Sequence, residues 1–226
     1  MEASKCKIGI CQPWTSPFLM TPFVDSALNI QCPEGYQLRW FRGPGWCSAK
    51  RHTAAIESAL LWGSELLVIV GSDQVYEEDV ICRLVARFKE YGGIIAAIVP
   101  SRGYVGFQEM LPFQRMAWRI KRSGPVSIDE ANGIMGEMNV VEAIDPDAGE
   151  MQRIDFIGSG CVLFHKDHLL SMKRPWFSEQ FNPETYERLA SMDTRWIWNM
   201  AQASGAQAWV DTTIKIKHLH LFPIDE

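Results

Sequence analysis

The chain has 226 residues, of which 47% are hydrophobic and 22% are charged, with a formal net charge of -5. This balance excludes a disordered or fibrous chain, and the negative charge excludes a surface that is basic throughout. A chain of this length is expected to bury a large core in one domain, residues 1–226.

Short apolar strands alternate with helices through the first hundred residues, an order typical of an α/β protein. Strands are expected at residues 7–11, 66–70 and 94–99, which are short and rich in Ile and Val. Because helices separate them, these strands should run parallel and form the centre of the sheet. The predicted fold class is therefore α/β, with a mainly parallel mixed sheet flanked by helices.

Two helices are predicted in this first part of the chain. The first begins at Ser48, whose hydroxyl is expected to cap it, and ends in a left-handed turn at Gly63. The second follows Asp73 and stops at Gly92 and Gly93. Glycine favours such helix ends because it adopts positive φ without a steric cost.

Residues 100–139 lack a clear period, and Gly, Pro and aromatic residues are interspersed among charges. One helix is expected here, near residues 107–121, in which Arg115, Arg119 and Arg122 share a face. Such a face is usually only solvated. The alternative is a basic contact surface for an anionic acceptor, a polymer or a membrane surface.

Strands and one helix are predicted in the last third of the chain. They are a hairpin of strands 140–144 and 151–157, a strand at 161–164, a helix at 193–203, and closing strands at 208–210 and 214–218. Asp193 is expected to cap the helix and Gly205 to end it.

The six cysteines show no C-x-x-C pair and no framework spacing, so they are expected to be reduced thiols in a cytoplasmic protein. The N-terminal residues lack the apolar core of a signal peptide. No uninterrupted apolar run approaches the roughly 20 residues that a membrane helix needs. These features agree with the expected cytoplasmic location.

The most informative segment is LLVIVGSDQ, in which an apolar strand runs directly into Gly71, Ser72 and Asp73. Ligands of open α/β sheets bind at the carboxyl ends of such strands. A carboxylate there suits a hard cation that neutralises phosphate oxygens. Asp73 equally fits a residue that only stabilises the following turn, and the segment alone leaves both interpretations open.

His218 and His220 stand two residues apart on the last predicted strand, so both imidazoles point to the same face. Together they would supply a nitrogen ligand to a metal ion. Histidines at this spacing also occur on surfaces and in cores, so the pair alone does not decide its own role.

Three segments, taken in order and with their spacing, resemble GT-A glycosyltransferases of the family 2 type. They are RHTAAIESALLWGSELLVIVGSD, RIDFIGSGCVLFHKDHL with the following RPWF, and MDTRWIWNMAQASGAQAWVDTTIKIKH. In that family the first segment ends in a D-x-D motif, the second lines the sugar and acceptor pockets, and the third ends in a metal-binding histidine. The resemblance spans about residues 5–220.

This resemblance implies a Rossmann-like GT-A domain with a nucleotide-binding half at 1–100 and an acceptor-binding half at 101–226. It implies a glycosyltransferase that uses Mn²⁺ or Mg²⁺ to move a sugar from a nucleoside-diphosphate sugar to an acceptor hydroxyl. The acceptor would be a glycan, a small molecule or a polymer.

The same resemblance assigns roles to single residues. Asp73 matches the second aspartate of D-x-D, His218 matches the closing metal ligand, and His220 is its substitute. Asp193 matches the acidic residue that acts as a base in inverting members. The residues expected around the donor are Gln12, Pro13, Thr15, Arg51, Ser72, Arg102, Gly158, Ser159 and Gly160.

One position departs from the family pattern, because Gly71 stands where D-x-D has its first aspartate. Loss of that carboxylate favours an alternative function, a catalytically degenerate GT-A domain that binds a nucleotide sugar or a glycan. A nucleotidyltransferase would share the sheet and the carboxylates. The segment CQPWTSPF after the first strand, however, lacks the glycine-rich, basic loop expected of that class.

Overall fold

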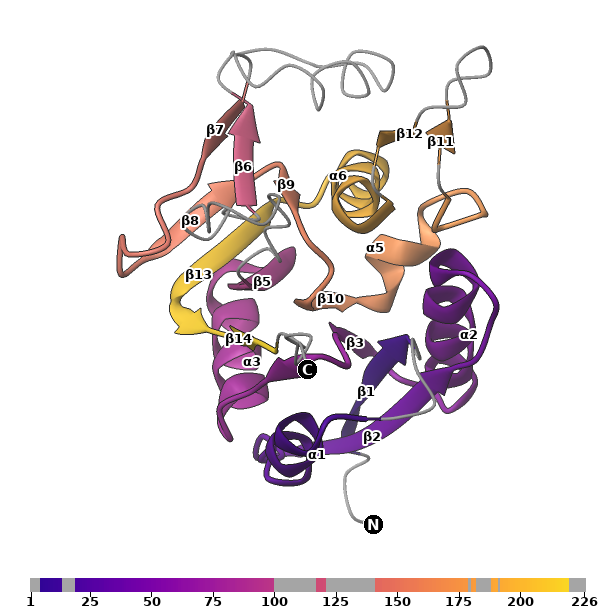
Figure 1. Ribbon diagram of the computed structural model, residues 1–226, viewed down its shortest axis with the longest axis vertical. Coiled ribbons are helices and arrows are strands. Elements are labelled where there is room, and N and C mark those ends of the chain that lie inside the picture. Colours follow the sequence, from indigo (N-terminus) through magenta and orange to yellow (C-terminus); the bar gives the residue numbers. More distant parts are fainter. Residues whose placement is uncertain are drawn as a thin grey trace, which may run out of the picture.

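The computed structural model describes residues 5–13, 19–99, 117–120, 141–178, 180–181, 188–190 and 192–219. These residues form one large mixed sheet with helices on both faces, as Figure 1 shows. Strands from both the first and the second half of the chain belong to this sheet.

Seven strands of the described residues form the main sheet, in the order β2-β1-β3-β10-β5-β13-β8. Their bounds are β1 (Cys6–Pro13), β2 (Tyr36–Gly43), β3 (Leu66–Val70), β5 (Ile94–Ile98), β8 (Met151–Ile154), β10 (Cys161–His165) and β13 (Ala208–Lys215). β1 is parallel to both β2 and β3, and β5 is parallel to β13. β10 runs antiparallel between β3 and β5, so the expected parallel strands do not all neighbour one another.

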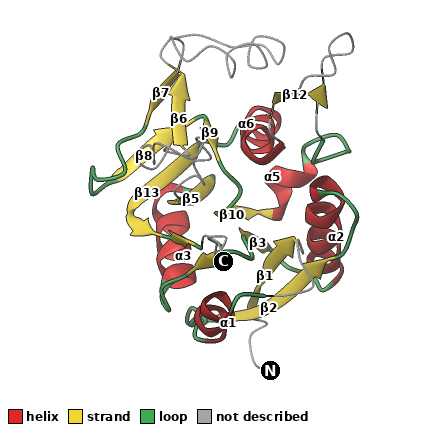
Figure 2. Ribbon diagram, viewed as in Figure 1, coloured by secondary structure: helices red, strands yellow, loops and turns green. Residues whose placement is uncertain are grey.

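The helices lie in two layers, one on each face of the sheet (Figure 2). Those described are α1 (Thr21–Leu28), α2 (Ser48–Leu61), α3 (Val80–Tyr91), α5 (Lys166–Leu170) and α6 (Met192–Ser204). Successive strand residues point to opposite faces, which gives each face its own apolar cluster. Leu67 and Phe164 pack with α2 and α6, whereas Val68 and Leu163 pack with α1 and α3.

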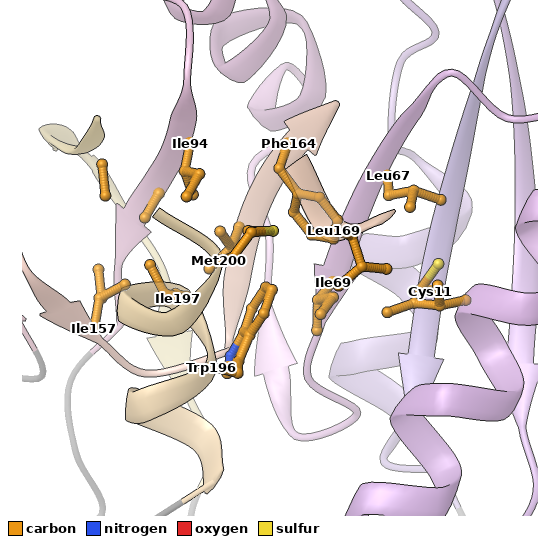
Figure 3. Packing of buried hydrophobic residues seen from close by; sticks show 14 of the residues in the cluster. Cys11, Leu67, Ile69, Ile94, Ile157, Phe164, Leu169, Trp196, Ile197 and Met200 are labelled. Carbon is orange, nitrogen blue, oxygen red and sulfur yellow. The ribbon is translucent and has the colours of Figure 1, made fainter. Parts of the chain in front are cut away.

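Trp196 of α6 lies within the first of these clusters, beside β10 (Figure 3). Its side chain is 2% exposed, and its ring centroid lies 5.4 Å from that of Phe164 and 5.2 Å from that of Phe177. Burial of a large apolar side chain stabilises a fold by about 3 kcal/mol. Trp196 therefore contributes strongly to holding α6 against the sheet.

The central strands and the glycine helix ends agree with the sequence predictions. β3 occupies the predicted residues, and β5 ends one residue before the predicted limit. Gly63, Gly92 and Gly205 have φ values of 86°, 67° and 71° where α2, α3 and α6 end. Sequence analysis missed α1 and β2, although Tyr36, Leu38 and Trp40 of β2 alternate with polar residues and pack on one side of the sheet.

The predicted caps of α2 and α6 are wrong. Cys47 occupies the cap position of α2 and its side chain makes no capping hydrogen bond, so Ser48 is the first helical residue. α6 begins at Met192, which places Asp193 inside the first turn instead of before it. Relative to the polar cap signal, α2 extends one residue further toward the N-terminus and α6 extends two residues further.

The predicted hairpin of 140–144 and 151–157 is also wrong. β7 (Val141–Ala143) pairs with β6 (Ala117–Ile120), whereas β8 pairs with β13 in the main sheet. β9 (Phe156–Ile157) pairs with the other side of β6 and completes a three-stranded sheet. These strands thus pair with strands that are distant in the sequence, and not with the nearest predicted strand.

β6 corrects the helix expected at 107–121, because residues 117–120 form a strand. Trp118 on β6 packs against Phe156 and Trp198, and this burial favours the extended form. Arg119 lies on this strand and bonds through Nε to the carbonyl of Arg153. The predicted helical face is therefore not formed at Arg119, while Arg115 and Arg122 lie outside the described residues.

The closing strands form one continuous strand, β13, followed by β14 (Lys217–His218), which pairs with β4 (Gln74–Val75). A further small sheet pairs β11 (Gln180–Phe181) with β12 (Arg188–Ala190). All six cysteines are free thiols. None of the helices in the described part of the chain has the length and apolar character needed to cross a membrane.

Candidate metal centre

Segments from three parts of the chain meet at one edge of the main sheet. β1 and β3 end at this edge, and β10 begins there because it runs in the opposite direction, with Cys161 opposite Val70. The amide of Gly71 donates a hydrogen bond of 2.9 Å to the carbonyl of Gly160. The turn at 158–160 therefore lies against the start of the Gly71–Asp73 segment.

A short two-stranded ladder holds His218 beside Asp73. β14 is antiparallel to β4, with His218 opposite Gln74, and the amide of Leu219 donates to the carbonyl of Asp73 at 2.8 Å. The Oδ2 atom of Asp73 and the Nε2 atom of His218 are 3.4 Å apart, and the side chains are 20% and 13% exposed. A carboxylate and an imidazole from distant parts of the chain thus meet at the edge of the sheet.

This donor pair fits a divalent cation. Carboxylate oxygen suits Mg²⁺ and Mn²⁺, and imidazole nitrogen is a common ligand of transition metals. Two ligands that are each about 2.1 Å from one ion stand roughly 3.0–3.4 Å apart, and the Asp73–His218 separation lies at the upper end of this range. No group of three or more His, Cys, Asp or Glu side chains gathers within the described residues.

The side chain of Gln74 leaves little room for a side chain at position 71. A Cβ atom there would stand 2.7 Å from Cδ and 2.8 Å from Nε2 of Gln74, which is 3% exposed. The Tyr76 hydroxyl donates a 2.6 Å hydrogen bond to Oε1 of Gln74. Burial raises the pKa of Tyr76 well above its usual value, so the phenol remains a neutral donor. An amide therefore fills the space beside Gly71, where the family pattern has a carboxylate.

Three of the predicted donor residues lie where the first strands end. Gln12 and Pro13 are the last residues of β1 and are buried. Arg51, in the first turn of α2, donates through Nε to the carbonyl of Gly45 at 2.7 Å. A Cβ atom on Gly43, the last residue of β2, would collide with the carbonyl of Arg51. This close packing of β2 against α2 fixes Arg51 at the end of β2.

The remaining predicted residues are less fully described. Ser72 lies at the edge of the sheet between Gly71 and Asp73 and is half-buried. Thr15, Arg102 and His220 lie outside the described residues. Asp193 lies in the first turn of α6, and its side chain is outside the described part.

The segment RPWF, which the resemblance places at the acceptor pocket, packs against α2. The Arg174 guanidinium bonds to Glu57 at 2.6 Å and lies over the Trp176 ring, 4.2 Å from its centroid. The Phe177 ring contacts that of His52, with 4.9 Å between centroids. Trp176 is buried, so it is a core residue in this structure and not an open stacking surface for a sugar.

Sequence analysis missed Gln74 and Tyr76 as residues of this site. The signal in the sequence that could have identified them is their spacing by two residues, since it places both side chains on the same side of an extended segment. β4 spans only Gln74–Val75 and has no apolar run, so the segment is too short for its sequence pattern to predict a strand. Their role depends on Gly160, which is distant in the sequence.

Comparison with known proteins supports the fold. No protein-family model matches the chain, and no curated protein matches its sequence. The crystal structure of A197 from STIV matches with a TM-score of 0.51 and 12% identity over 98% of each chain. The structure of S. aureus TarS 1-349 in complex with UDP-GlcNAc gives a TM-score of 0.47 and 10% identity, over 97% of this chain and 59% of that chain. The likeness to A197 shows the fold alone, and the expected GT-A-like α/β arrangement is confirmed.

Proposed function

We propose that this chain is a metal-dependent glycosyltransferase that transfers a sugar from a nucleoside-diphosphate sugar to an acceptor hydroxyl. The observation that carries the proposal is the 3.4 Å approach of Asp73 Oδ2 to His218 Nε2 where β3 ends. The GT-A-like fold supports it, because ligands of open α/β sheets bind at the carboxyl ends of the strands. The whole chain would act as one domain, with its nucleotide-binding half at 1–100.

Asp73 and His218 would hold the cation, Mn²⁺ or Mg²⁺, with His220 as the alternative nitrogen ligand. When bound, the cation would neutralise charge on the diphosphate as the sugar leaves it. The ladder of β4 and β14 would keep the two ligands together, because the backbone of Leu219 is bonded directly to that of Asp73. Such positioning lowers the cost of assembling the site when the donor binds.

The donor would lie along the edge formed by the strand ends. Gln12, Pro13 and Thr15 would contact the base or ribose, and Arg51, Ser72 and Arg102 would contact the ribose, the phosphates or the sugar. The turn Gly158–Gly160 would line the sugar pocket, since its backbone already bonds to Gly71. Asp193 would accept the proton of the acceptor hydroxyl as that oxygen attacks the anomeric carbon and the diphosphate departs.

The test is to measure binding of Mn²⁺ with UDP or GDP by calorimetry, and donor hydrolysis or transfer by product analysis. Asp73→Ala and His218→Ala should each weaken metal-dependent nucleotide binding by at least about tenfold and abolish turnover. The chain offers a matched control in His165 and Asp167, whose Nδ1 and Oδ2 atoms also lie 3.4 Å apart. Asp167→Ala and His165→Ala should leave nucleotide binding unchanged. Undiminished turnover of Asp73→Ala would refute the proposal.

A second candidate function is favoured by the lack of room at Gly71. A domain without the first carboxylate of D-x-D would bind a nucleotide sugar or a glycan without transferring the sugar. The same experiment separates the two functions. Metal-dependent binding that is lost in His218→Ala, together with no hydrolysis or transfer for any nucleotide sugar tested, would favour the binding module.

A further inference from the structure

Gln74 lies at the contact between the two segments of the candidate site. Its backbone pairs with His218 in the β4–β14 ladder, and it follows Asp73 directly in the chain. Its side chain is almost fully buried, although nothing in the sequence marks it as a core residue. A buried amide must be hydrogen-bonded to be tolerated, and Tyr76 provides such a bond.

Two glycines make room for the amide of Gln74. A Cβ atom on Gly71 would stand 2.7 Å from Cδ of Gln74, and one on Gly160 would collide with its Nε2 atom. Neither glycine has the positive φ that favours glycine elsewhere in this chain. The space taken by Gln74 therefore favours glycine at position 71, and at position 160 it does so together with Val99, whose Cγ2 atom would lie 2.9 Å from an added Cβ.

Tyr76 holds the amide in this place from the other side. Its hydroxyl is 2.6 Å from Oε1 of Gln74, 3.0 Å from the carbonyl of Gly71 and 3.4 Å from that of Gly160. The amide and the phenol thus both contact the segment of Asp73 and the turn at 158–160. Removal of either group should loosen the position of Asp73 relative to that turn.

We infer that Gln74 is a positioning residue of the candidate site. Its amide takes the place of a side chain at position 71 and holds the segment 71–73 against the turn 158–160. The cation site consequently has Asp73 but no carboxylate at position 71, and cation binding depends strongly on the diphosphate of the donor. The identity of the ligand in this inference rests on the proposed function. The packing of Gln74 is independent of that function.

A double-mutant cycle of Gly71→Asp and Gln74→Ala tests this inference. The readouts are the melting temperature and the affinity for Mn²⁺, measured with and without UDP well below the melting temperature. A Cβ atom at position 71 would lie 3.0 Å from Oδ1 of Asp73, so a new carboxylate there would stand beside the existing one. Gly71→Asp alone should lower the melting temperature without a gain in Mn²⁺ affinity, because Gln74 obstructs the new side chain.

The double variant should melt at a higher temperature than Gly71→Asp and bind Mn²⁺ without UDP about tenfold more tightly than the native protein does. Gln74→Ala alone, and to a lesser degree Tyr76→Phe, should weaken Mn²⁺–UDP binding about tenfold. Leu169→Ala is the control, since it removes a buried side chain of α5 in the apolar cluster on the other face of the sheet from Tyr76. It should lower the melting temperature and leave the affinity for Mn²⁺ and UDP within about twofold.

The outcomes separate this inference from the proposed function. If Gly71→Asp lowers the melting temperature equally in the native background and in the Gln74→Ala background, and gains Mn²⁺ affinity equally in both, the inference is overturned and the metal site stands. If the melting temperatures show the expected coupling but no variant binds Mn²⁺ or UDP, Gln74 keeps its packing role and the proposed function fails.

Discussion

Asp211 provides a quantitative test of the contacts that hold β13 against α3. β13 leads into β14, which carries His218 of the candidate site. The side chain of Asp211 is only 1% exposed and lies on β13, at the start of the register shift between Asp211 and Lys215 that precedes β14. Oδ2 accepts a 2.8 Å hydrogen bond from Nε of Arg87, and Oδ1 accepts from the backbone amide and hydroxyl of Thr213. These bonds hold the middle of β13 against α3.

We expect Asp211→Ala to lower the free energy of unfolding by about 2 kcal/mol. A hydrogen bond to a charged group contributes about 1.5–3 kcal/mol, and the variant loses several such bonds. The loss is partly offset because the carboxylate no longer has to be desolvated. Arg87 is 34% exposed and keeps its 3.1 Å contact with Glu90, so it is not left as an unpaired buried charge. For a chain of this length the melting temperature should fall by about 4–8 °C.

Urea denaturation followed by circular dichroism measures this change. The control is Asp147→Ala, which removes an exposed ion pair with Lys215 and should change stability by less than about 0.5 kcal/mol. A loss below about 0.5 kcal/mol in Asp211→Ala as well would refute the assigned role of the buried network.

The same network gives a pH dependence with a definite sign. Burial alone would raise the pKa of Asp211, but the hydrogen bonds from Thr213 and Arg87 and the charge of Arg87 outweigh burial and lower it. A lowered folded-state pKa means that the stabilisation is fully present above the unfolded pKa of about 3.9 and is lost as the pH falls through the folded value. The stability difference between the native protein and Asp211→Asn should therefore be constant above about pH 5 and shrink in more acidic solution.

Two further predictions concern the core and the thiols. Trp196→Ala should lower the free energy of unfolding by about 3–5 kcal/mol, because it leaves a cavity between Phe164 and Phe177. Trp196→Phe should lower it less, since the indole Nε1 is a buried donor with no partner among the described residues. Equal losses for the two variants in urea denaturation would contradict this expectation. Burial raises the pKa of Cys161 to about 12 and raises the pKa of Cys11 further. In the folded protein at pH 8, iodoacetamide should therefore alkylate neither of these thiols, whereas the exposed Cys32 should react. Peptide mass mapping that finds Cys161 modified as fast as Cys32 would contradict this expectation.

The sequence alone indicated features that depend on a few neighbouring residues. The apolar runs at 66–70 and 94–98 form the central strands, and Gly63, Gly92 and Gly205 end helices in the left-handed conformation. These predictions hold because burial on both faces and positive φ leave a mark within a short window. Asp73 was also selected from the sequence, by its position after an apolar strand, and His218 was selected by its spacing from His220 and by the resemblance to GT-A glycosyltransferases.

Only the tertiary structure decided which segments meet. β10 inserts between β3 and β5, and β7 and β8 belong to different sheets although they are neighbours in the chain. The pairing of His218 with Gln74, and the packing of that amide between two glycines, follow from contacts between distant residues. Local periodicity reports how much of a segment is buried, but not against what, because the partner is chosen by the packing of the whole sheet.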